Sequence, residues 1–315
     1  IRLNRLRKEL LKSNMIGMLD ITVVILTFNE EIHIERCLQN VNGFAKKVYV
    51  IDSLSTDKTV EIAERLGAIV VPHAWPGNQA AQFNWALDHI QIDTEWVLRL
   101  DADEYLLPEL IEEMKEKVSS LPESITGVTF KRRHIFLDKW MKKGIYPVMI
   151  LRMFRYGKAV CEQRLMDEHI ELLEGESVTF ENDFVDHNLN NLSWWSQKHV
   201  GYAVREAAEL LDVEYNLTGT DSGARHLSPA TLKKRNLKLK YAKQPLFWRS
   251  FAYFCYRYFF KMAFLEGKEG FLWTFLQGWW YRTLVDAKIF EIKKACGNDP
   301  EKIKQHLKAE YHIEL

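Results

Sequence analysis

The stretch "ITVVILTF", Ile21–Phe28, is a continuous run of apolar and β-branched residues. Such a run is typical of a strand that is buried on both faces of a sheet. Further strands are predicted at residues 47–52, 68–71, 96–104 and 125–133, with single helices between them at residues 30–41, 56–66, 80–90 and 108–119. Strands that alternate with single helices predict an α/β fold with a mostly parallel sheet flanked by helices.

The composition is that of a globular protein with a sizeable core, since 47% of the 315 residues are hydrophobic and 27% are charged. Lysine plus arginine and aspartate plus glutamate both number 43, so no basic excess points to nucleic acid. The four cysteines lie far apart and form no CxxC pair, which argues against a zinc site and a disulfide framework.

Three segments are expected along the chain. Residues 1–20 are basic without an apolar core, and we interpret them as a helical leader or a remnant of expression. Residues 21–225 are expected to form the α/β domain, and residues 226–315 a helical, aromatic-rich C-terminal region. No apolar run reaches the ~18 residues that are needed to span a bilayer.

Polar residues follow three of the predicted strands, at Asn29, at Asp52 and at Asp101–Glu104. In parallel sheets, ligands bind beyond the carboxyl ends of the strands. Asp101 and Asp103 can turn both carboxylates toward one point, and their oxygens suit Mg²⁺ or Mn²⁺. The alternative is an acidic helix N-terminus before Pro108, stabilised by the helix dipole.

Asp52 ends a predicted strand, where a carboxylate can bind ribose hydroxyls or a base N–H. The alternative is a helix cap with an Asx turn. Neither phosphate-binding glycine motif, GxGxxG nor GxxxxGK[ST], occurs in the chain. This argues against a dinucleotide oxidoreductase and a P-loop enzyme.

Four segments together resemble the GT-A domain of family 2 glycosyltransferases: "VVILTFNEE", "VYVIDSLSTDKT", "WPGNQAAQFNWAL" and "VLRLDADE". Their order and spacing match over roughly residues 21–104. The C-terminal half more loosely resembles the bacterial subgroup that includes lipopolysaccharide-core β-1,4-glucosyltransferases.

The resemblance implies a nucleotide-sugar site. Thr27, Asn29 and Glu31 match the first nucleotide-binding turn, and Asp52 matches the aspartate that meets the nucleoside. Gln79, Gln82 and Asn84 fall in the stretch that lines the donor pocket in the family. Trp75 would then form a wall of that pocket, or it is merely an aromatic side chain packed on the helix that follows. Asp101 and Asp103 match the DxD pair, and Asp103 is taken as the direct metal ligand.

An inverting transfer needs a base that deprotonates the acceptor hydroxyl. Family members carry an acidic pair downstream, and "RLMDEHIEL" supplies Glu168 as the base with Asp167 in reserve, although its letters depart from the usual pair. A polar turn between strands is the alternative. His187 is either a third metal ligand or a structural histidine. Arg152 and Arg155 are candidate contacts for the diphosphate or the acceptor, or exposed basic residues with neither role.

Residues 245–284 interleave Trp, Tyr and Phe with Arg and Lys. Aromatic helices with cationic edges suit the membrane interface. The alternatives are a helical subdomain packed on the core or a dimer interface.

The function expected from these residues and the resemblance is an inverting, metal-dependent hexosyltransferase of bacterial cell-surface polysaccharide or lipopolysaccharide biosynthesis. Its donor would be a UDP-sugar with Mg²⁺ or Mn²⁺, and its acceptor a lipid-linked glycan. It would be cytoplasmic and peripherally attached to the cytoplasmic membrane, with its oligomeric state open. A sugar nucleotidyltransferase and a non-catalytic nucleotide-sugar-binding scaffold are the alternatives.

Overall fold

The computed structural model describes residues 17–164, 166, 168–218 and 229–315, and for residues 229–235 it describes the backbone alone. Contacts divide the chain into two compact units. The sheet unit comprises the residues up to 134 together with 147–163 and 169–189. The helical unit comprises residues 135–146, 164–168 and 190–315, so the residues that follow 189 group with the C-terminal helices rather than with the sheet.

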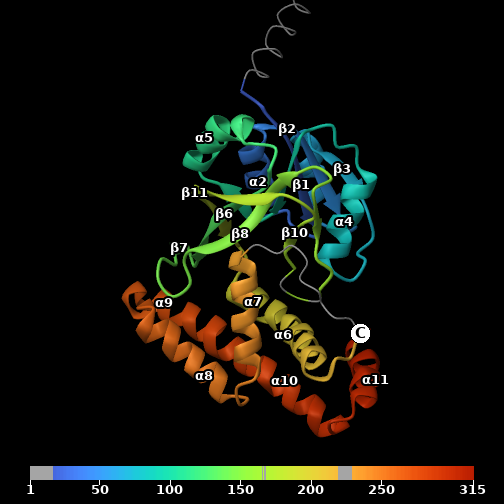
Figure 1. Ribbon diagram of the computed structural model, residues 1–315, viewed down its shortest axis with the longest axis vertical. Coiled ribbons are helices and arrows are strands. Elements are labelled where there is room, and N and C mark those ends of the chain that lie inside the picture. Colours follow the sequence, from blue (N-terminus) through green and yellow to red (C-terminus); the bar gives the residue numbers. More distant parts are fainter. Residues whose placement is uncertain (1–16, 165, 167, 219–228) are drawn as a thin grey trace, which may run out of the picture. The chain divides into compact units, whose positions relative to one another are not determined.

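The large sheet has the strand order β3-β2-β1-β4-β8-β6-β11-β5. Figure 1 labels β3, β2, β1, β8, β6 and β11 of this sheet. Its parallel half consists of β1 (Leu19–Thr27), β2 (Ala45–Asp52), β3 (Ile69–Pro72) and β4 (Trp96–Asp101). The register pairs Thr27 with Asp52 and Leu26 with Asp101. The carboxyl ends of three strands therefore meet at one edge, as the sequence predicts.

The other half of the sheet is antiparallel, so the sheet as a whole is mixed rather than mostly parallel. It consists of β5 (Glu104–Leu106), β6 (Ile125–Phe136), β8 (Val148–Arg155) and β11 (Glu176–His187). A short separate pair is formed by β9 (Ala159–Cys161) and β10 (Ile170–Leu172). Antiparallel neighbours need no crossover helix, which explains why the strand–helix alternation stops after residue 131.

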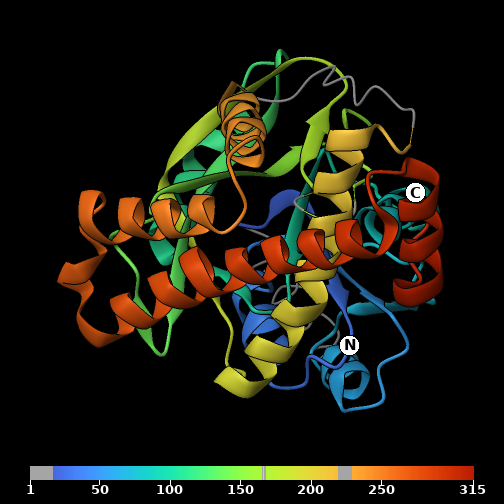
Figure 2. The ribbon, with the colours of Figure 1, turned by 90° about the horizontal axis from the view of Figure 1, so that it is seen from below.

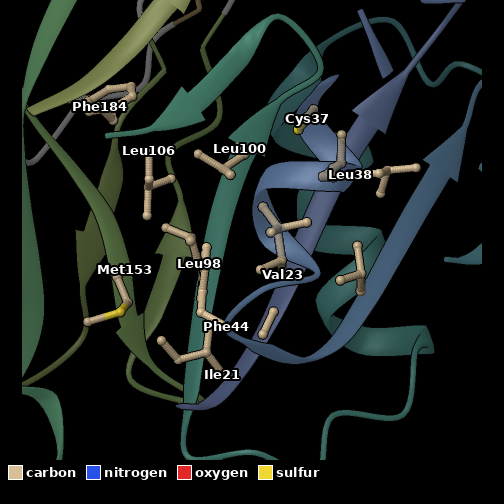
Figure 3. Close-up of a cluster of buried hydrophobic side chains, with 14 of the residues drawn as sticks. Ile21, Val23, Cys37, Leu38, Phe44, Leu98, Leu100, Leu106, Met153 and Phe184 are labelled. Atoms are coloured by element: carbon tan, nitrogen blue, oxygen red, sulfur yellow. The ribbon is translucent and has the colours of Figure 1, made fainter. Parts of the chain in front are cut away.

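The parallel strands are buried on both faces. Ile21, Val23 and Ile25 of β1 pack in one apolar cluster, whose side chains Figure 3 shows between sheet and helix. Val24 packs in a second cluster, on the opposite face, with Phe83. The helices of this unit are α2 (Ile34–Val41), α3 (Thr59–Arg65), α4 (Gln79–His89) and α5 (Pro108–Lys117), followed by the 3-10 turn Val118–Ser120. Because α2 and α5 contribute to the first cluster and α4 to the second, helices cover both faces.

The helical unit packs around two long helices, α6 (Leu192–Tyr215) and α10 (Tyr281–Cys296), which cross in Figure 2. Its other helices are α7 (Pro229–Ala242), α8 (Trp248–Cys255), α9 (Gly267–Trp273) and α11 (Pro300–Tyr311), with π-helical segments at Tyr256–Phe260 and Thr274–Trp280 and a 3-10 turn at Ala263–Glu266. The strand β7 (Lys139–Trp140) forms a hairpin with the end of β6. Among the described residues, no helix is long and apolar enough to cross a membrane.

Candidate functional site

The carboxyl ends of β1 and β2 are joined through Asp52. Thr27 Oγ1 donates to Asp52 Oδ1 over 2.8 Å, and Ser55 donates to the same carboxylate through its hydroxyl (2.6 Å) and its backbone N–H (2.7 Å). These donors compensate the burial of the Asp52 charge. Both lone pairs of Oδ1 are used, so Oδ2 keeps one acceptor position for a nucleoside hydroxyl or N–H.

Asn29 links the same two turns from the other side. Its φ of 56° lies in the left-handed region, which turns its N–H toward Ser55 Oγ at 2.8 Å. Its Oδ1 accepts the N–H of Thr56 over 2.8 Å. The helix that the sequence predicts from residue 30 begins instead at Ile34, because the preceding residues form this turn.

Glu31 fastens the turn to the start of α3. Its N–H donates to Asp57 Oδ2 over 3.1 Å, and its Oε2 accepts the N–H of Lys58 over 3.1 Å. The three residues assigned to the nucleotide-binding turn, Thr27, Asn29 and Glu31, are thus brought together with Asp52 at one edge of the sheet.

Gln82 of α4 is fully buried beneath this edge. Its Nε2 donates to Ser53 Oγ over 3.1 Å, and its Oε1 lies 2.6 Å from His73 Nδ1. Gln82 therefore supports the turn after β2 from below. Trp75, in the loop before α4, is 43% exposed, so its ring is available to a ligand.

Two further residues of α4 contact neighbouring strands. Gln79 Oε1 accepts a hydrogen bond from Arg99 over 3.1 Å. The amide of Asn84 forms two hydrogen bonds with the backbone of Cys161, at 2.7 and 2.8 Å, and so holds β9 against the helix. The side chains of Gln79 and Asn84 thus form hydrogen bonds that connect α4 to other parts of the sheet unit.

The acids after β4 are partly neutralised by buried arginines. Arg152 of β8 contacts Asp101 Oδ2 at 3.2 Å and forms a close ion pair with Glu104. Arg99 lies 3.8 Å from the other oxygen of Asp101. Glu104 also accepts the N–H of Asp101 over 3.0 Å, which closes the turn.

A fourth acid, Asp186 of β11, belongs to the same cluster, since it is paired with Glu104 in the β11–β5 register. It lies 3.3 Å from both Arg132 and His134. Three of the four acids in the cluster therefore have cationic partners.

Asp103 differs from the other three acids. Its Oδ2 accepts the side-chain N–H of Asn188 over 2.9 Å, and no lysine, arginine or histidine of the described chain forms an ion pair with it. Arg36 of α2 instead donates to the backbone oxygen of Asp103 (3.1 Å) and to Nδ1 of His187 (3.2 Å). Because a guanidinium can only donate, a neutral His187 ring carries its hydrogen on Nε2. His187 would have to give up this contact to bind a metal ion.

The crowding of acids affects their protonation. Burial, together with Asp186 and Asp101, raises the pKa of Asp103 to about 6. Burial raises the pKa of Glu104 to about 8, although Arg152 opposes the rise. Burial also disfavours the charged form of Asp101, but Arg152 and Arg99 outweigh it and lower the pKa of Asp101. Burial and the neighbouring acids thus disfavour the ionised forms of Asp103 and Glu104, whereas the arginines favour that of Asp101.

Asp103 is the acid that a divalent cation would suit. Mg²⁺ and Mn²⁺ bind one or two carboxylates together with substrate phosphate oxygens. Within the described ranges, no three His, Cys, Asp or Glu side chains are grouped so as to hold a metal ion by themselves. Metal binding at this edge would therefore use Asp103, with Asp101 beside it, and oxygens of the bound substrate.

Of the two candidate bases, Glu168 lies among the described residues, and it is not in the sheet unit. Glu168 is half-buried in the segment 164–168, which groups with the helical unit. Asp167 lies outside the described residues. Both assignments stay predictions from the sequence.

The family model for glycosyl transferase family 2 matches residues 22–170. Residues 22–170 form a family 2 glycosyltransferase domain. The sheet with helices on both faces is the GT-A fold that the resemblance implies, and the recognition from sequence is confirmed.

Several relatives share this glycosyltransferase domain. An uncharacterized glycosyltransferase of Rickettsia bellii is 45% identical over 95 residues, which are 30% of this chain and 31% of that protein. A lipopolysaccharide core biosynthesis glycosyltransferase of Rhizobium meliloti is 25% identical over 152 residues, 46% of this chain and 54% of that one. The chain thus spans about a third of the length of the first of these relatives and about half of the second.

Among solved structures, glucosyl-3-phosphoglycerate synthase from Mycobacterium tuberculosis, in complex with Mn²⁺, UDP and glucosyl-3-phosphoglycerate, is similar to this chain. It is 25% identical, the match covers 39% of this chain and 46% of that one, and the TM-score is 0.30.

The sequence interpretation of the glycosyltransferase domain missed three residues that shape the acid cluster. Arg152 was considered for a diphosphate and is instead the buried partner of Asp101 and Glu104. Arg36 and Asn188 were not singled out, although Asn188 directly follows His187 in the quoted motif. The position of Asn188 next to a candidate metal ligand could have indicated its role. The sequence of α2 contains no pattern that indicates the role of Arg36.

Proposed function

We propose that this protein is an inverting glycosyltransferase that moves a hexose from a UDP-sugar to a hydroxyl of a lipid-linked glycan, in the synthesis of bacterial cell-surface polysaccharide or lipopolysaccharide. The family 2 glycosyltransferase domain at residues 22–170 supports transfer of a sugar. The proposal adds the identities of the donor, the acceptor and the metal.

The observation that carries the proposal is the state of Asp103. Its carboxylate stands at the edge where ligands of such sheets bind, next to three acids that already have cationic partners. Burial, together with the nearby Asp186 and Asp101, raises its pKa and so disfavours its ionised form. A divalent cation bound with a nucleotide diphosphate would favour that form.

The neighbouring turns supply the remainder of a donor site. Oδ2 of Asp52 keeps an acceptor position, and the Asn29 turn holds the loop after β1 against it. The bound cation would stabilise negative charge on the departing diphosphate. Asp103 and Asp101 would hold it, and Trp75 would cover the donor from the loop before α4.

Glu168 is proposed as the base that takes the proton of the acceptor hydroxyl, with Asp167 in reserve. Replacing Glu168 by Gln should lower transfer without weakening nucleotide binding, because the two steps use different groups. Loss of nucleotide binding in Glu168→Gln would contradict the assignment.

Thermal unfolding with nucleotides tests the donor site. UDP, GDP, dTDP and CMP are each added with and without Mn²⁺, since a ligand that binds the folded state raises its melting temperature. UDP with Mn²⁺ should raise it most, and Asp103→Asn should abolish the part that depends on Mn²⁺. Asp93→Asn, an exposed acid at the far end of β4, is the matched control. An equal Mn²⁺-dependent shift in Asp103→Asn would overturn the metal role.

A further inference from the structure

Exposed large apolar side chains gather on one stretch of the helical unit, from α8 to α9. Trp248 and Phe260 are 72% and 79% exposed. The other members of this aromatic surface are Phe251, Tyr256, Phe259, Met262, Phe264, Leu265 and Phe271. Single exposed apolar residues are normal on a protein surface, but a concentration of this kind marks an interaction site.

Ring contacts connect much of the aromatic surface. Tyr258 contacts Phe259, Phe264 and Phe271 at centroid distances of 5.2, 6.2 and 5.8 Å. Phe254 beneath them contacts both Tyr258 and Phe271. Trp248 joins this group through Phe251 and Trp279, which contacts Phe254. Tyr256 and Phe260 form a separate stacked pair in the adjoining turn of the chain.

The same part of the chain carries positive charge alone. Residues 222–265 contain no aspartate or glutamate, while they include six lysines and four arginines. Lys261 and Lys268 are exposed beside the aromatic surface, since Lys261 lies over the Tyr256 ring and Lys268 lies next to Phe264 and Phe271. The next two acids in the chain add no unpaired negative charge to this surface. Glu266 is buried, and Glu269 forms an ion pair with Lys139.

We infer that the aromatic surface docks on a lipid bilayer that contains anionic headgroups. Exposed Trp and Phe side chains partition into the interface of a bilayer, and lysines beside them are attracted to anionic lipids. This deepens the proposed function, because a surface-bound enzyme meets a lipid-linked acceptor in two dimensions. Vesicle binding itself requires neither the sugar donor nor transfer.

A hollow in the aromatic surface fits this partner. It has a volume of about 570 Å³ and is lined by Tyr258, Phe264, Gly267, Lys268, Phe271 and Leu272. One lysine at an otherwise apolar hollow matches a lipid, whose charged headgroup adjoins apolar chains.

A second copy of the chain is a poorer partner for this surface. A twofold contact brings the same patch against itself. Two surfaces with lysines and no free acid would then face each other, and like charges at close range repel. An anionic bilayer supplies the opposite charge that the surface lacks.

Co-sedimentation with vesicles tests the inference. The full chain is mixed with vesicles of phosphatidylcholine alone, and of phosphatidylcholine mixed equally with phosphatidylglycerol. Binding to the anionic vesicles should be stronger and should fall as salt is raised. Phe260→Ser with Trp248→Ser should weaken it by about tenfold or more, from the apolar area lost.

Two control variants separate this effect from general damage. Leu173→Ser removes an apolar side chain of comparable exposure (53%) in the sheet unit and should bind vesicles as the wild type does. Lys261→Glu with Lys268→Glu should remove the preference for anionic vesicles, whereas Lys294→Glu, an exposed lysine of α10, should not.

Failure of the wild type to bind either vesicle would overturn the inference, and a concentration-dependent dimer in sedimentation velocity would then assign the surface to a second copy. Equal binding by Phe260→Ser with Trp248→Ser would also overturn it. The thermal shift with UDP and Mn²⁺ is measured without lipid, so failure of the donor site is distinguishable from failure of the membrane surface.

Discussion

Arg152 is the position where the structure makes its sharpest prediction about stability. Its guanidinium pairs with Glu104, and the two side chains are 7% and 2% exposed. The same guanidinium contacts Asp101 at 3.2 Å. Replacing Arg152 by Met keeps much of the side-chain volume but leaves a buried carboxylate without its cation. Breaking a buried pair from one side costs about 3–5 kcal/mol.

The measurement is urea denaturation at pH 9, above the pKa of about 8 of Glu104, followed by circular dichroism, for wild type and Arg152→Met. Lys46→Met is the control, because its ion pair with Asp20 is about half exposed on both sides and should be worth about 0–1 kcal/mol. Adding Glu104→Gln to Arg152→Met should restore part of the loss, since a neutral amide tolerates burial better than a charge.

A lower pH should relieve the Arg152→Met defect. Burial already raises the pKa of Glu104 to about 8, and removal of Arg152 would raise that pKa further. Below about pH 8 the carboxyl is protonated in both folded proteins, so the penalty specific to the variant should grow as pH rises above about 8 and shrink as pH falls below it. A loss below about 1 kcal/mol at pH 9, or a loss that does not depend on pH, would refute this reasoning.

Two further predictions concern single charged groups. Burial and neighbouring acids raise the pKa of Asp103 to about 6, and cation binding needs its ionised form. Mn²⁺-dependent binding of UDP should therefore weaken as pH falls through about 6. Titration calorimetry at several pH values measures this affinity, and an affinity that does not change with pH would contradict the prediction. Arg257 is buried, its Nε and Nη2 have no hydrogen-bond partner among the described residues, and burial lowers its pKa. Arg257→Met should therefore raise the free energy of unfolding by about 1 kcal/mol or more. A lower urea midpoint than wild type would show that the contact of the guanidinium with Tyr253 outweighs its burial.

The acid cluster shows how far the sequence could predict the site. The sequence predicts that Asp101 and Asp103 lie at the end of a strand, because a local pattern of residues defines where a strand ends. It does not predict which side chains contact these two acids. Arg152 lies 51 residues after Asp101, on an antiparallel strand whose pairing depends on contacts across the whole sheet. The raised pKa of Asp103 likewise depends on Asp186, which reaches the cluster through β11.

The sequence by itself determined the family domain, the parallel strands and the edge at which Thr27, Asp52 and Asp101 meet. Apolar runs buried on both faces, separated by single helices, allow few other arrangements. The tertiary structure alone decided that the sheet is mixed, that Gln82 is a buried support beneath that edge, and that Asp103 is the acid without a cationic partner among the described residues. The physical reason is that burial and charge pairing depend on which distant strands become neighbours, and no local pattern specifies those neighbours.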